Sequence, residues 1–291
     1  MILQNVLLGV KCVIDTFIHW GGGEMADFKI IQKGSVAFGC FPAWNQLGVV
    51  HGFTCRSGGE SDVVPGTLNM ALHVGDDPEK VIRNRKKVAE ALGFALENTV
   101  TCAQVHGTRV VPVTLAQAGR GAFALNDTIP ETDGLITDCR NLPLMLFYAD
   151  CVPVLLVDRK GPAIGVIHAG WRGSVGHIVQ NAVQAMAEAY GTKPGNLSAA
   201  IGPSIGPCCY EVDERVHEKA LAYQGCFTPH GEGHYLLDLW QLNKLQLMEA
   251  GILAENILKA GVCTCHHVDQ FFSHRKEKGK TGRLAAILYR K

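Results

Sequence analysis

The sequence has no excess of charge of either sign. Its 291 residues include 27 lysines and arginines and 27 aspartates and glutamates, so the formal net charge at pH 7 is zero. Without a net field, the chain has no electrostatic means of gathering nucleic acid or an acidic membrane surface. We therefore expect a small-molecule substrate, and neither nucleic acid nor membrane as a partner.

The sequence also lacks a long apolar run. Residues 7–14 are apolar but interrupted by Lys11, and no A-x-A-like cleavage site follows, so neither a transmembrane helix nor a signal peptide is expected. Residues 21–24, Gly-Gly-Gly-Glu, directly precede Met25, and their codons are purine-rich, as in a bacterial ribosome-binding site. We hypothesise that translation starts at Met25 and treat residues 1–39 as an N-terminal extension. Because no linker-like composition follows, residues 40–291 are expected to form a single domain.

The even cysteine spacing of a secreted disulfide framework is missing too. The chain has 11 cysteines, and the adjacent pair Cys208 and Cys209 is poorly placed to form a bridge. We interpret the cysteines as thiols in a reducing compartment, which predicts a cytoplasmic protein.

The most informative stretch runs from Asp150-Cys151 to His168. Residues 154–157 and 163–167 are apolar runs separated by a turn-like segment, which predicts two buried strands. If these strands form an antiparallel hairpin, Cys151 and His168 lie at the same end of the sheet. A buried cysteine near a histidine is commonly core packing. Gly170 and Gly173 nevertheless favour a site where the backbone approaches a ligand.

A third candidate ligand, His106, lies at a tight turn between two expected strands, residues 100–105 and 109–114. An isolated histidine in a turn is more often exposed or capping than a metal ligand. Together with Cys151 and His168 it completes a set of two nitrogens and one sulfur, which zinc accepts with a fourth position left open. Since structural zinc sites normally have four protein ligands, three scattered ligands favour catalysis.

Several residues are candidates for holding an anion or a base. Arg56 lies in a glycine-rich loop, and Arg172 precedes a helix expected over residues 178–190, whose N-terminus favours a phosphate. Tyr210 follows a rigid loop with two Gly-Pro steps and is a candidate for stacking on a base. Arg275 and Arg283 are further anion candidates. The segment Cys-Thr-Cys-His-His at residues 263–267 fits a tetrahedral metal badly without a partner element, so we rank it second.

Five motifs together resemble the YfiH family, also called the laccase-domain or multicopper polyphenol oxidase family. They are Gln-Val-His-Gly at residues 104–107, Ala-Asp-Cys-Val-Pro at 149–153, His-Ala-Gly-Trp-Arg-Gly at 168–173, Ile-Gly-Pro-Ser-Ile-Gly-Pro-Cys-Cys-Tyr-Glu-Val at 201–212 and Phe-Phe-Ser-His-Arg at 271–275. The resemblance covers essentially residues 40–290. It implies an α/β fold of one domain, layered α/β/β/α with mixed sheets and related to the catalytic domain of cytotoxic necrotising factors.

The resemblance further implies that His106, Cys151 and His168 bind zinc and act in catalysis. The implied reactions are phosphorolysis of adenosine, inosine and methylthioadenosine with phosphate, and hydrolytic deamination of adenosine. Substrate-binding roles are expected for Arg56, Asn69, Asp150, Arg172, Tyr210 and Arg275. Copper is a possible occupant of the same ligands. A true laccase needs many more histidine ligands than a chain with 12 histidines and no His-x-His repeats supplies, so the oxidase interpretation fails.

Two other function classes stay open. Cys151 and His168 without a metal would suit a cysteine hydrolase or amidase in peptidoglycan metabolism, with His106 as a bystander. A binding protein without catalysis is a third class, although such a protein has little need of an open metal site.

Overall fold

The computed structural model describes residues 28–291. Its centre is a mixed six-stranded sheet in which the two outer pairs are parallel and the inner pairs antiparallel. In sheet order its strands are β13 (Ile257–Lys259), β9 (Leu197–Ile201), β7 (Val152–Asp158), β8 (Ile164–Ala169), β5 (Gly134–Thr137) and β4 (Val110–Pro112). The hairpin expected around Cys151 and His168 is confirmed as β7 and β8.

A second, antiparallel sheet packs face to face on the first. In sheet order its strands are β1 (Lys29–Lys33), β2 (Val36–Cys40), β3 (Val49–Thr54), β14 (Leu284–Arg290) and β6 (Leu144–Tyr148). Leu144 and Leu146 of β6 pack with Leu155 and Val157 of β7 in the core between the sheets. Both strands are buried along their whole length because each sheet is covered on both faces, which explains their continuous apolar sequences.

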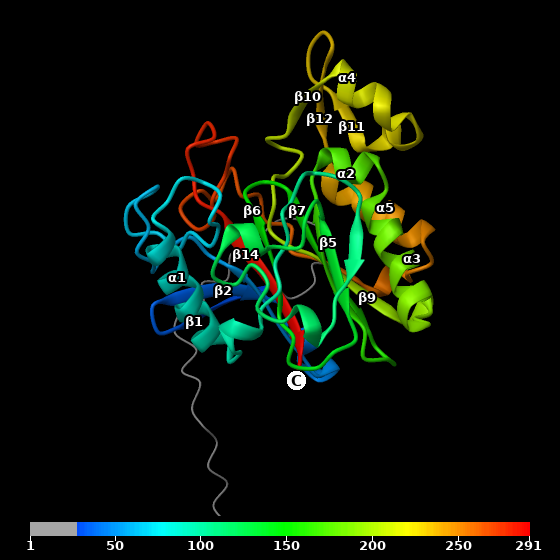
Figure 1. Ribbon diagram of the computed structural model, residues 1–291. Helices are drawn as coiled ribbons and strands as arrows, with labels where there is room; N and C mark the ends of the chain where they lie inside the picture. The colour runs from blue at the N-terminus through cyan, green and yellow to red at the C-terminus, as the bar shows by residue number, and fades with distance from the viewer. Residues whose placement is uncertain (1–27) are drawn as a thin grey trace, which may run out of the picture.

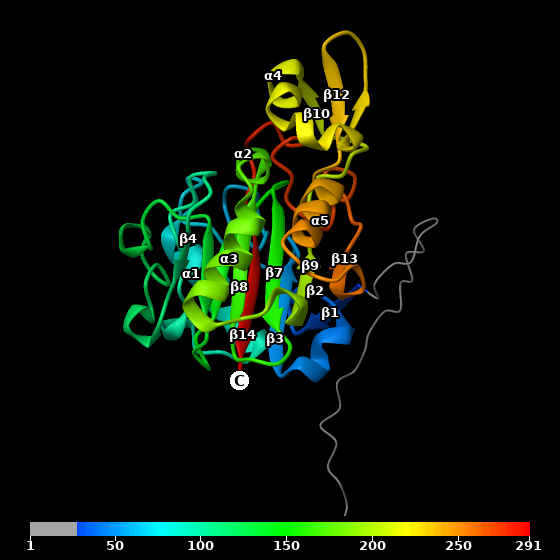
Figure 2. The same ribbon diagram turned by 90° about the vertical axis from the view of Figure 1, so that its right-hand side faces the viewer.

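Helices cover the two outer faces (Figures 1 and 2). Helix α1 (Pro78–Leu92) packs on the five-stranded sheet, and α3 (Ile178–Tyr190) and α5 (Leu239–Glu249) pack on the six-stranded sheet. The order is therefore α/β/β/α, as the resemblance implied. None of the helices between residues 28 and 291 is both long and apolar enough to cross a membrane.

A small third sheet extends from one end of the molecule, at the top of Figures 1 and 2. It consists of β10 (Glu211–Asp213), β12 (His234–Leu237) and β11 (Phe227–Pro229), with α4 (Glu214–His217) beside it. Helix α2 (Trp171–Val175) lies near its base. Short 3₁₀ helices complete the fold: η1 (Pro42–Leu47), η2 (Leu96–Asn98), η3 (Leu115–Gln117), η4 (Leu125–Asp127), η5 (Pro194–Asn196), η6 (Glu218–Cys226) and η7 (Ala254–Asn256).

The strand expected over residues 100–105 is wrong. Only Val100 and Cys102 form isolated bridges, and each pairs with a different segment. The side chain of Gln104 then takes the place of backbone pairing, since its amide donates to the Phe147 carbonyl and accepts from the Phe147 N–H. This side-chain exchange ends regular pairing just before His106.

The N-terminal extension also ends earlier than expected. Strands β1 and β2 lie within residues 29–40 and belong to the five-stranded sheet. The alternation that marks β2 is weak, because this short strand is buried along most of its length. The hypothesis that translation starts at Met25 concerns residues outside the described range and stays a prediction.

Candidate active site

Three metal-donor side chains meet at one end of the six-stranded sheet. Pairing of β7 with β8 places Pro153 opposite His168, so Cys151, just before β7, lies beside His168. His106 joins them from a turn, with its ring centroid 4.8 Å from that of His168. The donor atoms of His106, Cys151 and His168 all lie within 4.8 Å of one another. The hairpin argument therefore placed Cys151 and His168 correctly.

Asp133, which immediately precedes β5, holds two of these residues in place. Its carboxylate lies 2.8 Å from Nδ1 of His168 and accepts the backbone N–H groups of Val105, His106 and Gly107. A histidine whose Nδ1–H donates to a carboxylate presents Nε2 to the site. One carboxylate thus sets both the ring orientation of His168 and the shape of the His106 turn.

The backbone around the donors is shaped for close approach. His106 has a φ of 60°, a conformation unusual for a residue with a side chain, and the three N–H bonds to Asp133 stabilise it. Gly170 lies so near that a Cβ there would stand 3.1 Å from Cys151 Sγ and from a ring carbon of His106. Any side chain at position 170 would push into the donor cluster.

The electrostatics favour a thiolate. Burial raises the pKa of Cys151, but the nearby His168 and His106 outweigh it and lower the pKa to about 6. Burial lowers the pKa of His168, whereas Cys151 and Asp133 raise it to about 9. At neutral pH the metal-free cluster thus holds a thiolate beside a histidine that keeps its proton.

The donor set fits a zinc ion with an open side. Two imidazoles and one thiolate are ligands that zinc accepts, and Asp133 supplies the outer hydrogen bond typical of a metal-binding histidine. His168 is only 3% exposed, whereas His106 is exposed. The accessible side of the cluster is therefore the His106 side.

Aromatic and cationic side chains near this end of the sheet offer binding groups. Arg172 on α2 is exposed and lies over the Trp171 ring at 4.6 Å. Arg275 lies 5.2 Å from the centre of the Tyr210 ring. Burial raises the pKa of Tyr210, Cys151 and Asp150 raise it further, and Arg275 and Arg172 oppose the increase. Tyr210, both arginines and Cys151 are thus close enough to interact electrostatically.

The helix N-terminus expected beside Arg172 differs from the sequence interpretation. Arg172 belongs to the short helix α2, and α3 begins only after His177, whose φ is 66°. Gly173 and Gly176 permit this break, since a Cβ at either position would come within 2.8 Å of neighbouring atoms. The N-terminus of α3 is therefore separate from Arg172.

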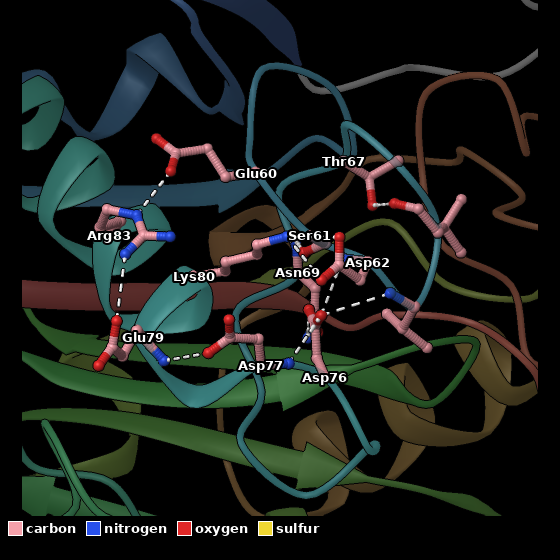
Figure 3. A network of polar contacts seen from close by, with 12 residues as sticks. Glu60, Ser61, Asp62, Thr67, Asn69, Asp76, Asp77, Glu79, Lys80 and Arg83 are labelled. Atoms are coloured by element: carbon pink, nitrogen blue, oxygen red, sulfur yellow. Dashed lines mark hydrogen bonds and ion pairs between the residues drawn. The ribbon is translucent and has the colours of Figure 1, made fainter.

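Arg56 and Asn69 are occupied by contacts within the fold. Arg56 donates to the Val268 carbonyl and forms a 2.9 Å ion pair with Glu277. Asn69 is fully buried, and its amide donates to the Ala71 carbonyl. It also donates to Asp76 (Figure 3). In this arrangement both side chains hold loops rather than face a ligand.

Asp150 connects three segments beside Cys151. Its carboxylate accepts the Thr264 hydroxyl and the Arg275 N–H, each at 2.7 Å, and its carbonyl accepts the Ile205 N–H. Its φ of 81° turns the chain sharply before Cys151. Asp150 therefore positions the loop that carries Arg275.

A small pocket lies beside Gln104, two residues before His106. It measures about 180 Å³, and its lining includes His73, Arg85, Gln104 and Phe147 but none of the three donors. Burial lowers the pKa of His73 to about 4, so this space holds a neutral imidazole at neutral pH.

The sequence interpretation missed Asp133. Its signal was weak: an Asp-Gly step at the start of the apolar segment 135–137 reads as an ordinary turn. Only the antiparallel pairing of β5 with β8, which sets Gly134 opposite Ile167, brings Asp133 to His168.

Comparison with known proteins identifies a family that matches this chain. The family model described as multi-copper polyphenol oxidoreductase laccase matches residues 50–291. A purine nucleoside phosphorylase YlmD of Geobacillus stearothermophilus is 41% identical over 249 residues, which cover 84% of this chain and 91% of that protein. The purine nucleoside phosphorylase YlmD of Bacillus subtilis is 38% identical, covering 84% of this chain and 89% of that protein.

Solved structures share the whole fold. The hypothetical protein YfiH of Bacillus licheniformis superposes with a TM-score of 0.86 at 38% identity, covering 91% of this chain and 99% of that one. The structure of YlmD from Geobacillus stearothermophilus gives a TM-score of 0.85 at 38% identity, with 90% and 98% covered.

Proposed function

The chain belongs to the multi-copper polyphenol oxidoreductase laccase family, the YfiH family, and on that premise we propose that it is a zinc-dependent purine nucleoside phosphorylase. The observation that carries the proposal is the cluster of His106, Cys151 and His168, with one exposed side and one ring held by Asp133. The names of the relatives support the substrate class. We extend the proposal to adenosine, inosine and methylthioadenosine as substrates, to deamination of adenosine, and to a cytoplasmic location.

In phosphorolysis, a phosphate oxygen forms a bond to C1′ of the ribose as the bond from C1′ to the purine nitrogen breaks. The electron pair of the broken bond leaves with the base, which takes up the proton of the phosphate. The products are the free base and ribose 1-phosphate. The protein therefore has to hold a dianion, orient the ribose and stabilise the departing base.

The residues of this chain divide those tasks. We assign phosphate binding to Arg172 and Arg275. Both guanidinium groups are near enough to Tyr210 to affect its pKa. The Tyr210 ring provides a surface on which a purine stacks. His106, Cys151 and His168 would hold the zinc ion, which supplies a Lewis acid when bound. Asp133 keeps the His168 ring in position, and Asp150 keeps Arg275 in place.

Deamination of adenosine uses water instead of phosphate. A water oxygen forms a bond to C6 of the purine and the bond from C6 to the amino nitrogen breaks. The amino group takes up one proton of the water and leaves as ammonia, and the other proton moves to N1 of the base. C1′ and C6 lie on different parts of adenosine, so one site would have to accept the nucleoside in two orientations to run both reactions.

A laccase activity does not fit the donors. Between residues 28 and 291, two groups of metal-donor residues are found, one with three members and one with four, and together they contain three histidines. A mononuclear copper with a trinuclear cluster needs more histidines than this. We therefore propose zinc as the metal, with copper as a competitor for the same ligands.

A cysteine hydrolase is the second candidate, favoured by one observation. Cys151, His168 and Asp133 form a thiol, imidazole and carboxylate series, the order found in nucleophilic triads. Alkylation with iodoacetamide separates the two candidates. A bound zinc ion protects Cys151 in the phosphorylase, whereas a free catalytic thiolate reacts rapidly in protein as isolated.

The experiment that tests the proposal is chromatography of products from adenosine, with and without phosphate, using protein of measured zinc content. Adenine that forms only with phosphate supports phosphorolysis, and inosine formed without phosphate supports deamination. No product from zinc-loaded protein would overturn the proposal and favour the hydrolase.

A further inference from the structure

Two irregular loops run side by side at one end of the six-stranded sheet. One follows β9 and the other follows β13, and these strands are parallel neighbours, so both loops leave the same end of the sheet. Their backbones stay paired, because Ser204 N–H donates to the Val262 carbonyl and Thr264 N–H to the Ser204 carbonyl. Backbone groups that lie 58 or more positions apart in sequence are thereby held in contact.

Four metal donors meet where these loops touch. Cys208 and Cys209 come from the first loop, Cys263 and His266 from the second, and their donor atoms all lie within 4.8 Å of one another. Cys208 Sγ stands 3.5 Å from His266 Nδ1. In a tetrahedral zinc site, bonds of about 2.0–2.3 Å separate neighbouring donor atoms by roughly 3.5–3.8 Å, so small side-chain movements close this set around one ion.

The first loop is shaped to present two consecutive cysteines. The N–H groups of Cys209 and Tyr210 both donate to the Gly206 carbonyl, which winds residues 206–210 into one turn. Gly206 is needed at this point, since a Cβ would stand 2.8 Å from Trp240 and 3.2 Å from Cys208 Sγ. The close approach of the loop to Trp240 and Cys263 depends on that glycine.

The surroundings suit a thiolate ligand. Gly206 N–H donates to Cys263 Sγ at 3.2 Å, the kind of outer hydrogen bond that stabilises a metal-bound sulfur. Cys263 is buried, whereas Cys208 and His266 are exposed. Exposed residues gain little from packing, so core packing does not account for the approach of Cys208 and His266 to the other two side chains.

We propose that Cys208, Cys209, Cys263 and His266 bind a structural zinc ion, separate from the cluster of His106, Cys151 and His168. Three thiolates and one imidazole form a closed tetrahedral set with no open position for substrate. The ion fastens the loop before Tyr210 to the loop that carries Arg275. It also braces Thr264, whose hydroxyl donates to Asp150 beside Cys151.

Zinc content of the full chain tests the proposal. Wild-type protein is expected to hold one zinc ion in each of the two groups. Cys208→Ser with Cys263→Ser is expected to lose one zinc per chain, and His106→Ala with Cys151→Ser to lose the other. Cys139→Ser, a partly exposed cysteine outside both groups, is the matched control and is expected to keep both.

Wild-type zinc content in Cys208→Ser with Cys263→Ser would overturn the proposal. Thiol counting in unfolded wild-type protein without reductant adds a second test, because a disulfide among the three cysteines would equally overturn it.

Cobalt substitution of wild-type protein keeps the proposal falsifiable if the double variant fails to fold. Thiolate-to-cobalt charge-transfer absorption is expected to match four thiolates per chain, three from the new site and one from Cys151. Absorption that matches one thiolate would overturn the proposal.

Discussion

The two groups of metal donors differ in how the fold carries them. His106, Cys151 and His168 sit at the end of a central hairpin and beside a turn tied to Asp133, whereas Cys208, Cys209, Cys263 and His266 sit on loops outside the sheet. The first group has three donors and an exposed side. The second has four and no position left for a substrate.

The number of donors in each group, and the structure that supports them, indicate the role of the group. A catalytic group needs an open position and rigid ligands, which a paired sheet end and a carboxylate provide. Loops without regular structure gain more stability from an ion whose four positions are all filled by protein ligands, since the ion links segments that make few other contacts. We therefore assign chemistry to the first group and loop stability to the second.

Removing a donor from the first group gives the largest expected effect. Cys151→Ser should lower kcat/KM for adenosine phosphorolysis by about 1000-fold or more, because the metal and its Lewis acidity are lost together. Steady-state rates with measured zinc content check this. Cys139→Ser should retain full activity, and a Cys151→Ser protein with wild-type rates would break the comparison.

Loosening a donor without removing it should cost less. Asp133→Asn keeps the shape of the side chain but removes its charge, and we expect zinc affinity and kcat to fall by about 10- to 100-fold. Zinc competition with a chelating dye measures the affinity. The nearby exposed carboxylate Glu131 provides the control, and Glu131→Gln should leave affinity unchanged. Equal loss in both variants would contradict the role of Asp133.

The cations beside Tyr210 should affect substrate binding more than chemistry. Arg172→Ala is expected to raise KM for phosphate by about 10-fold, with a smaller change in KM for the nucleoside, because one charge-assisted contact is lost. Initial rates at varied phosphate concentration test this. The exposed Arg215, which pairs with Asp213 on the small sheet, is the control. An Arg172→Ala enzyme with unchanged KM for phosphate would remove this residue from the site.

The second group should influence activity least. Loss of its zinc should lower the melting temperature and change kcat for phosphorolysis by less than about 10-fold, since Tyr210 and Arg275 lose support but no reacting group is removed. Calorimetry and rate measurements on Cys208→Ser with Cys263→Ser check both effects. A fall as large as that of Cys151→Ser would place the second group in the chemistry.

The two groups of metal donors have to be compared at a pH at which the protein stays folded, and the buried His51 makes folding stability depend on pH. His51 on β3 is buried, its Nε2 accepts the Phe41 N–H at 2.8 Å, and burial lowers its pKa from 6.5 to about 4. The unfolded chain binds this proton near pH 6.5 and the folded chain only near pH 4. The associated stability is thus present above pH 6.5 and is lost, up to about 3 kcal/mol, as pH falls to about 4.

Urea unfolding at pH 7.5 and pH 5 measures that loss. The His51→Gln variant has a side-chain oxygen that accepts the Phe41 N–H and does not titrate. Its stability should depend less on pH than that of the wild type. The same pH dependence in both proteins would show that His51 does not control it.

The sequence predicted local elements well and distant contacts unevenly. The helix expected over residues 178–190 follows from apolar spacing and the glycine after its end, and it agrees with α3. Cys151 and His168 were placed together because a short hairpin fixes both. Asp133 was missed because its contact depends on β5 pairing with β8, which no local pattern encodes.

The group of Cys208, Cys209, Cys263 and His266 also depends on a contact between distant segments that no local sequence pattern encodes. Composition marks Cys263 and His266 as metal donors, whereas Cys208 and Cys209 are interpreted in the sequence only as a poorly placed bridge and as part of a family motif. Parallel pairing of β9 with β13 brings the two loops together. Along the sequence, however, the small sheet and α5 lie between these two strands. The substrate-binding roles expected for Arg56 and Asn69 stay predictions, because the contacts that hold these side chains, to Glu277 and to Asp76, are not visible in the local sequence.

The measurement that tests the central claim most directly is a joint assay of zinc content and adenosine phosphorolysis on three proteins: wild type, His106→Ala, and Cys208→Ser with Cys263→Ser. We predict that each variant lacks one zinc per chain, and that only His106→Ala loses the phosphate-dependent formation of adenine. Activity that persists in His106→Ala, or that disappears only with the second group, would contradict the division between a catalytic and a structural metal site.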